Sequence, residues 1–133
     1  MIMERISPEW ITSLGENEIF VFGSNLEGMH GGGAALLAYE QFGAVWGQGN
    51  GLQGRSYGIP TMHGGADAIA PYVDEFIAFA REHSELRFLV TEIGCGIAGF
   101  AVEEMAPLFR PALDVENIYL PGRFVDALKE VKK

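Results

Sequence analysis

The chain has 133 residues, of which 48% are hydrophobic and 20% charged, and this composition predicts one compact domain spanning residues 1–133. A net charge of −9, with nine Lys and Arg scattered along the sequence, argues against binding to a nucleic-acid backbone. No apolar stretch approaches the ~20 residues of a membrane span, the N-terminal residues lack a signal-peptide pattern, and the single cysteine excludes an internal disulfide. We therefore expect a cytoplasmic protein without membrane contacts.

Short apolar runs alternate with helical patterns along the sequence. The runs at 19–22, 56–59, 88–93 and 117–120 predict strands, and the first and third are continuous enough for burial on both faces of a sheet. Apolar residues recur at helical spacing in 34–42, 69–80, 100–109 and 124–131. This alternation predicts a three-layer α/β/α fold with a mostly parallel or mixed central sheet.

Prolines and long loops modify this outline. Pro71 fits best in the first turn of the helix at 69–80, and Pro107 is expected to kink or shorten the helix at 100–109. Residues 43–65 form the longest irregular stretch, and such loops are often functional. Trp10 and Trp46 are expected in the core, although an exposed binding surface is the alternative.

The first of two glycine-rich turns follows the strand at 19–22. Ser24 and Asn25 come directly after the strand, and Gly31, Gly32 and Gly33 open into the next helix. Such a turn lets backbone N–H groups surround an anion at a helix N-terminus, although a tight loop that needs positive φ angles has the same composition. The Asn25 amide both donates and accepts hydrogen bonds, which suits ribose hydroxyls or, alternatively, an Asx-turn.

The second glycine-rich turn joins the strand at 88–93 to the helix at 100–109. It reads Gly94, Cys95, Gly96, Ile97, Ala98, Gly99 and Phe100. Its G-x-G-x-x-G pattern has the strand and helix of a dinucleotide site, but the next strand ends without the acid that holds the ribose of NAD. A second copy of the pattern at 49–54 is expected to lie in a loop and is not followed by a helix, so it lacks the structural context of a dinucleotide site.

The other reactive side chains give weaker signals. Cys95 is a candidate nucleophile with His30 or His63 as its base, but no orienting partner is evident. Together with His83, these histidines lack the spacing of metal ligands. We therefore expect no metal site and no cofactor.

Taken together, the two turns resemble those of the macro domain superfamily, whose members bind ADP-ribose. The resemblance covers roughly residues 17–120 and implies that Asn25 and the glycines at 31–33 face the distal ribose, while residues 94–99 wrap the diphosphate. Ser24 and Phe100, which flank these segments, are further expected ligand-binding residues. The segment 47–57 is similar to a small bacterial and phage branch of macro-like proteins. The chain departs from the family at Ala98, where one branch has an aromatic residue and another a catalytic aspartate, and in lacking an early acidic residue that anchors adenine.

Three functions follow from these patterns. The leading one is binding of ADP-ribose or a related nucleotide diphosphate through backbone amides. An alternative is an ADP-ribosyl hydrolase that acts on a modified protein, nucleic acid or metabolite, with Asn25 and His30 as catalytic residues. The third is a protein-binding adaptor without nucleotide binding, which would use the glycine-rich loop at 47–54.

Overall fold

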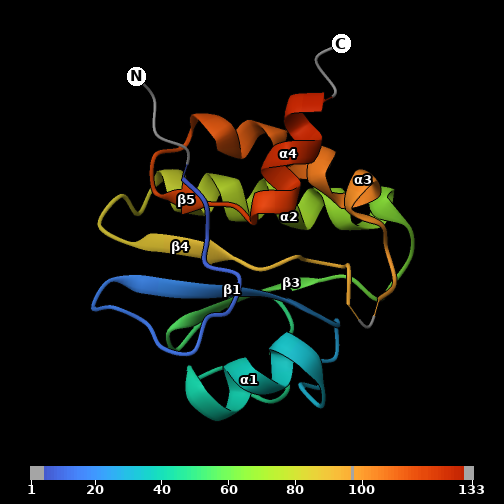
Figure 1. Cartoon of the computed structure of the whole chain (residues 1–133). Coiled ribbons are helices and arrows are strands. Elements are labelled where there is room, and N and C mark those ends of the chain that lie inside the picture. Colours follow the sequence, from blue (N-terminus) through green and yellow to red (C-terminus); the bar gives the residue numbers. More distant parts are fainter. Residues whose placement is uncertain (1–4, 97, 131–133) are drawn as a thin grey trace.

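A computed structural model describes residues 5–96 and 98–130 (Figure 1). The strands are β1 (Glu18–Ser24), β2 (Gly51–Gln53), β3 (Ser56–Pro60), β4 (Arg87–Val90) and β5 (Ile118–Tyr119). The helices are α1 (Gly33–Gln41), α2 (Ala66–Arg81), α3 (Val102–Met105), the 3₁₀ helix η1 (Ala106–Asp114) and α4 (Gly122–Glu130). Strands and helices therefore alternate as the sequence predicts.

The five strands form one mixed sheet in the order β2-β3-β1-β4-β5. Strands β3, β1, β4 and β5 run parallel to one another, whereas the edge strand β2 runs antiparallel to β3. In the central register Val21 lies between Tyr57 of β3 and Val90 of β4. A single bridge from Ile6 to Leu120 extends the pairing beyond β5.

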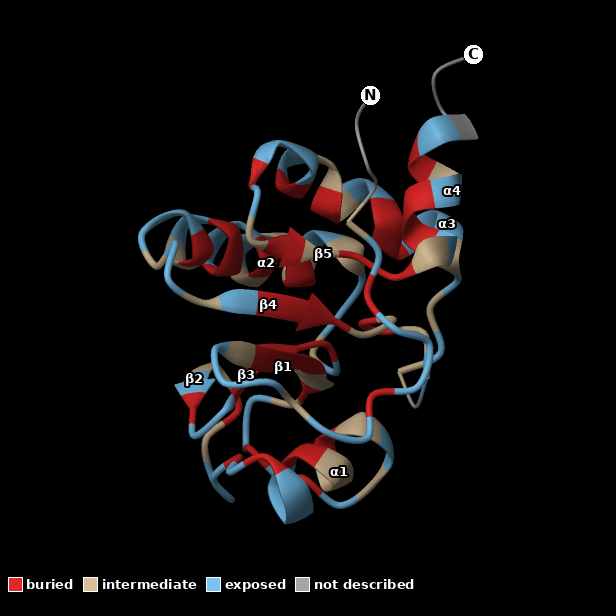
Figure 2. Cartoon of the chain, turned by 60° about the vertical axis from the view of Figure 1, so that its left-hand side comes forward, coloured by how far each residue is buried: buried red, intermediate tan, exposed pale blue. Residues whose placement is uncertain are grey.

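Helices cover both faces of the sheet and complete a three-layer α/β/α fold. Helix α1 lies on one face, whereas α2, α3 and α4 lie on the other (Figure 1). Because side chains alternate along a strand, β1 sends Phe20 and Phe22 toward α1 and Val21 toward α2. Figure 2 shows β1 and β4 buried almost throughout between the two helical layers. The continuous apolar runs in the sequence are explained by this burial on both faces.

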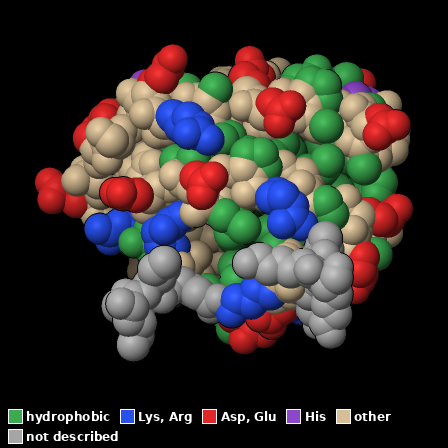
Figure 3. Space-filling view, turned by 90° about the horizontal axis from the view of Figure 1, so that it is seen from above, with side chains coloured by type: hydrophobic (Ala, Val, Ile, Leu, Met, Phe, Trp, Pro, Cys, Tyr) green, Lys and Arg blue, Asp and Glu red, His purple; other side chains and the backbone are tan. Residues whose placement is uncertain are grey.

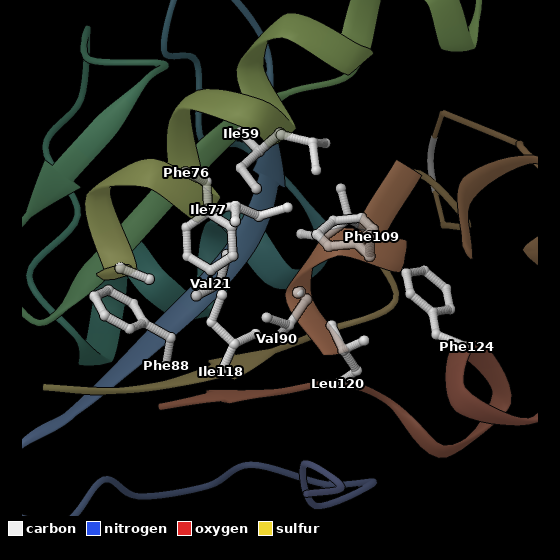
Figure 4. Packing of buried hydrophobic residues seen from close by; sticks show 14 of the residues in the cluster. Val21, Ile59, Phe76, Ile77, Phe88, Val90, Phe109, Ile118, Leu120 and Phe124 are labelled. Atoms are coloured by element: carbon white, nitrogen blue, oxygen red, sulfur yellow. The ribbon is translucent and has the colours of Figure 1, made fainter. Parts of the chain in front are cut away.

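The larger core lies between the sheet and α2, η1 and α4. Figure 4 shows Phe76 of α2 and Phe109 of η1 packed above Val21 and Val90 of the sheet. The ring of Phe76 meets that of Phe88 edge to face, with 5.5 Å between centroids. Complete burial of one such side chain stabilises the fold by about 1.5–3 kcal/mol.

Three details differ from the sequence prediction or refine it. Helix α2 begins at Ala66, so Pro71 lies inside the helix and not in its first turn, because Ile69 is fully buried and holds the preceding turn on the core. Pro107 ends the α-helical geometry of α3, as predicted, and η1 continues as a 3₁₀ helix. The prediction that residues 49–54 form a loop is wrong for residues 51–53, which form β2 and pair with β3.

The expectation that both tryptophans lie in the core is wrong. The side chain of Trp10 is 82% exposed, because the neighbouring Ile11 is the residue of this segment that reaches the core. Trp46 is half-exposed and rests edge-on against Tyr39, with 5.4 Å between ring centroids. Within the described part of the chain, no helix is long and apolar enough to cross a membrane.

Candidate functional site

A cleft of about 1260 Å³ lies on the α1 face of the sheet. It opens at the carboxyl ends of β4 and β5, beside Phe20 of β1, and runs between α1 and the N-terminal segment at 6–12. The lining comprises residues 6–12, Phe20, four residues of α1 (Gly33, Ala34, Leu37 and Gln41), the end of β4 (Val90, Thr91 and Glu92) and the start of α4 (Pro121, Gly122, Arg123 and Asp126).

The sheet topology explains why a cleft forms at this edge. From β1 the chain continues to strands on one side of the sheet, whereas from β4 it continues to β5 on the other side. Strands β1 and β4 are neighbours, so the strand order reverses between them. In open α/β sheets the helices diverge at this point, and the crevice outside the strand ends is the usual place for a ligand.

Two helices begin at the cleft, and neither has an acidic residue in its first turn. Helix α1 starts at Gly33, whose φ of +59° is allowed because glycine has no side chain, and the first backbone bond at its start runs from Leu36 N to Gly32 O. In α4 the first such bond runs from Phe124 N to Pro121 O. The preceding amides of both helices have no carbonyl of their own helix to bond. The cleft therefore receives the positive ends of two helix dipoles.

The charged side chains of the cleft are mostly acidic. Arg123 binds Glu92 through two hydrogen bonds, from Nε to Oε2 at 2.8 Å and from Nη2 to Oε1 at 2.5 Å. These bonds hold the pKa of the Glu92 carboxyl below its ordinary value and raise the pKa of Arg123. Glu9 and Asp126 add two further carboxylates to the lining. An anionic ligand would therefore depend on the backbone amides more than on basic side chains.

Basic side chains are also dispersed elsewhere on the molecule. On the face seen in Figure 3, which carries the layer of α2, η1 and α4, they are interspersed with acidic side chains. This distribution agrees with the low content of Lys and Arg and offers no track for a phosphate backbone.

Ser24 and Asn25 of the first predicted turn are used to hold the loops. The buried Ser24 donates from Oγ to the carbonyl of Gly49. Asn25 accepts at Oδ1 from Met29 N at 2.8 Å and donates from Nδ2 to Met29 O at 3.0 Å. These two bonds close the loop as an Asx-type turn would. Both polar groups of the Asn25 amide are thus engaged within the chain, and its role toward a ligand stays a prediction.

His30 lies in the interior, beside the cleft lining but not part of it. Its side chain is fully buried, and Nε2 is 2.9 Å from the carbonyl oxygen of Val45 and 3.3 Å from Oε1 of Gln53. The ring meets Phe22 edge-on, with 5.3 Å between centroids. Nδ1 has no hydrogen-bond partner among the described residues. Through Val45, the His30 ring connects the first turn to the loop after α1. The catalytic role of His30 stays a prediction.

The glycines at 31–33 do reach the cleft, through Gly33 at the start of α1. Gly31 is exposed and Gly32 is the N-cap residue of the helix, with an extended backbone. The structure therefore brings Gly33 and the next residue, Ala34, to the site. It does not bring Ser24, Asn25 or His30 to the cleft wall.

The second predicted turn follows the cleft residue Glu92, whose backbone carbonyl accepts from Cys95 N at 3.1 Å. Of its described residues, Gly94, Cys95, Gly96, Ala98, Gly99 and Phe100, none lines the cleft, and Ile97 lies outside the described residues. The turn closes on itself through a bond of 2.8 Å from Phe100 N to Gly94 O. It leads into the four-residue helix α3, where the carboxylate of Glu104 accepts from Ala101 N at 2.9 Å.

The surroundings of the candidate nucleophile Cys95, its candidate base His63 and the candidate metal ligands bear on their predicted chemistry. Burial and the nearby carboxylate of Glu92 raise the pKa of the Cys95 thiol, so it is protonated at neutral pH. His63 is engaged through Nε2 with the carbonyl of Ala68 at 3.0 Å. Among residues 5–96 and 98–130 there is no group of three or more His, Cys, Asp and Glu that could hold a metal ion.

Sequence reasoning missed the start of α4 and the tryptophan in the N-terminal segment. Gly122 and Arg123 line the cleft opposite α1, and Trp10 lines it from residues 6–12. A signal for the first was present, because Pro121 and Gly122 follow a strand and open a helix in the same way as the glycine-rich turns. For Trp10 the local sequence holds no comparable signal.

Comparison of the chain with family models, with curated proteins and with solved structures finds no match. Fold and geometry define a three-layer α/β/α protein with a cleft at the carboxyl edge of its sheet. The resemblance to macro domains stays a prediction from the two turns.

Proposed function

We propose that the protein binds a nucleotide diphosphate, with ADP-ribose as the leading ligand, in the cleft between α1, the sheet and the start of α4. The observation that carries this proposal is the meeting of two helix N-termini at one cleft. Helix N-termini bind phosphate groups through free amides and the helix dipole. Two of them suit a ligand with two linked phosphates.

The size and lining of the cleft support a ligand larger than a single phosphate. Its volume of about 1260 Å³ exceeds the ~300–1000 Å³ of most small-molecule sites. Phe20, Leu37 and Ile11 provide an apolar wall below the helix starts. Such a wall suits the faces of a sugar or a base, while the amides above it suit the diphosphate.

The predicted resemblance to macro domains supports ADP-ribose over other diphosphates. Gly33 is the residue common to the predicted site and the cleft. In the arrangement that we propose, the amides of Gly33 and Ala34 bind one phosphate, and those of Gly122 and Arg123 bind the other. This assigns to the start of α4 the diphosphate contacts that the resemblance to macro domains implies for residues 94–99.

Hydrolysis of ADP-ribosyl groups has less support than binding. It would need Asn25 or His30 to hold or activate water, yet the first is bonded to Met29 and the second is fully buried. The proposal therefore concerns binding.

A matched pair of substitutions at Ala34 tests the proposed site. An aspartate in the first turn of α1 places a carboxylate on the free amides, which is favourable for the helix but competes with a phosphate. An asparagine has the same shape without the charge. We expect Ala34→Asp to weaken ADP-ribose binding at least about tenfold more than Ala34→Asn, measured by isothermal titration calorimetry. The proposal is wrong if the unsubstituted protein shows no binding at millimolar ADP-ribose, or if both variants bind alike.

A further inference from the structure

We infer that Trp10 is a specificity-determining residue of the cleft: its indole stacks on the base of the bound nucleotide. This inference rests on the proposed function, because it adds the position of the base to a site in which the helix starts hold the diphosphate. The N-terminal segment would thus recognise the planar aromatic base of the ligand.

The exposure of Trp10 is the first observation behind this inference. Its side chain is 82% exposed, yet it lines both the main cleft and an adjacent hollow of about 360 Å³. Tryptophan carries one of the largest apolar surfaces of any side chain, and leaving that surface in water forgoes its burial energy. An indole at the edge of a cleft is available to a flat aromatic ligand.

The second observation is that Trp10 is held in place from both sides. Ser7 donates from its backbone N to Leu120 O at 2.8 Å and from Oγ to Val90 O at 2.7 Å. On the other side, Ile11 is buried in the smaller core. The indole therefore projects from a segment fixed within a few residues on each side, so stacking requires little additional ordering of the backbone.

Charge separates the two parts of the ligand along the cleft. Glu9, which precedes Trp10, places a carboxylate in the lining on the N-terminal segment. A phosphate is repelled there and is favoured at the start of α1, whereas a neutral base carries no such penalty. The base is therefore the part of a nucleotide that fits beside Trp10.

The second tryptophan of the chain provides a matched control. Trp46 does not line the cleft, and its ring meets those of Tyr39 and His30. In a Trp46→Phe variant, Trp10 is the only tryptophan, since the chain has two. The fluorescence of this variant then reports on Trp10 alone.

The experiment compares ADP-ribose with ribose 5-diphosphate, which keeps one ribose and the diphosphate but lacks the adenosine. We expect ADP-ribose to quench the fluorescence of Trp46→Phe, and ribose 5-diphosphate to bind without quenching it. By calorimetry, Trp10→Ala should weaken ADP-ribose binding by roughly 5- to 150-fold, the range measured for loss of one base–aromatic stack. Trp10→Phe should retain most of the affinity, and Trp10→Ala should leave ribose 5-diphosphate binding unchanged.

The possible failures are distinguishable. If Trp10→Ala weakens both ligands equally, or neither, the assignment of the base to Trp10 is overturned while the proposed function stands. If neither ligand binds to the unsubstituted chain, both the proposed function and this inference are overturned. Because Trp10 is exposed, an unchanged thermal unfolding curve for Trp10→Ala excludes loss of the fold as the cause.

Discussion

The two glycine-rich turns have similar compositions but end in very different helices. The first opens into α1, which has nine residues and no side chain over its initial amides. The second opens into α3, which has four residues and is capped by the carboxylate of Glu104. An anion site needs unpaired amides and a helix long enough to carry a dipole, and glycine content predicts neither.

A glycine that packs on the first turn and a glycine of the second turn also differ in how much space surrounds them. A Cβ on Gly49, which packs on the first turn, would lie 1.9 Å from the carbonyl oxygen of Asn25, whereas a Cβ on Gly96 of the second turn meets nothing within 4 Å. The first turn is therefore locked against its neighbours by backbone contact. Gly96 faces open space.

The largest expected effect tests this difference in packing. Gly49→Ala should lower the free energy of unfolding by about 3 kcal/mol or more, because the added methyl group would overlap the backbone of Asn25 and Leu26, which then has to move. Gly96→Ala should change it by less than about 0.5 kcal/mol. Urea unfolding followed by circular dichroism measures both. Equal stabilities of the two variants would show that the first turn is not locked in this way.

A smaller effect is expected at Asn25, which closes the first turn. Asn25→Ala removes both bonds to Met29 and should lower the free energy of unfolding by about 1–2 kcal/mol. Asn25→Asp keeps the acceptor for Met29 N and should cost less. ADP-ribose affinity, measured by calorimetry at a temperature where both variants are folded, separates closure of the loop from contact with the ligand. If folded Asn25→Ala loses more free energy of ADP-ribose binding than free energy of unfolding, Asn25 contacts the ligand.

The smallest expected effect concerns Glu92, which links the second turn to the start of α4. Its pKa is lowered in the folded protein by the hydrogen bond from Arg123, so the pair stabilises the fold above the ordinary carboxyl pKa. This stabilisation is lost as the pH falls through the lowered folded value. Because the pair is exposed to solvent, this stabilisation is small and decreases with salt. Unfolding curves of the unsubstituted protein and Glu92→Gln should differ at pH 7 and converge at acid pH, and a constant difference would contradict this account.

The fold was predictable from local sequence because apolar residues form continuous runs in its central strands and recur at helical spacing in its helices. The run at 19–22 is buried on both faces in β1, and α2 buries residues at helical spacing, among them Val73, Phe76 and Ala80. Strand β2 was missed because it has only three residues and one buried side chain, Gln53. A strand of this length is specified by its partner, Ser56–Pro60, more than by its own pattern.

The candidate site was predictable only in part, because it is built from distant segments. Gly33 could be found because the turn and the helix that it opens are adjacent in sequence. Arg123 and Trp10 reach the same cleft only once the sheet has placed β1 beside β4. Whether Asn25 faces a ligand or closes a turn depends on the position of the Met29 backbone, which the sequence does not state.

The attachment of the N-terminal segment has a consequence for the order of folding. Its hydrogen bonds from Ser7 to Val90 and from Arg5 to Leu113 join residues 83 and 108 positions apart in the chain. Contacts that close such long loops are costly until the intervening chain is ordered, so they form late. Residues 5–7 are thus expected to be among the last to dock. Until they do, the sheet and its helices can be complete while the cleft still lacks one wall.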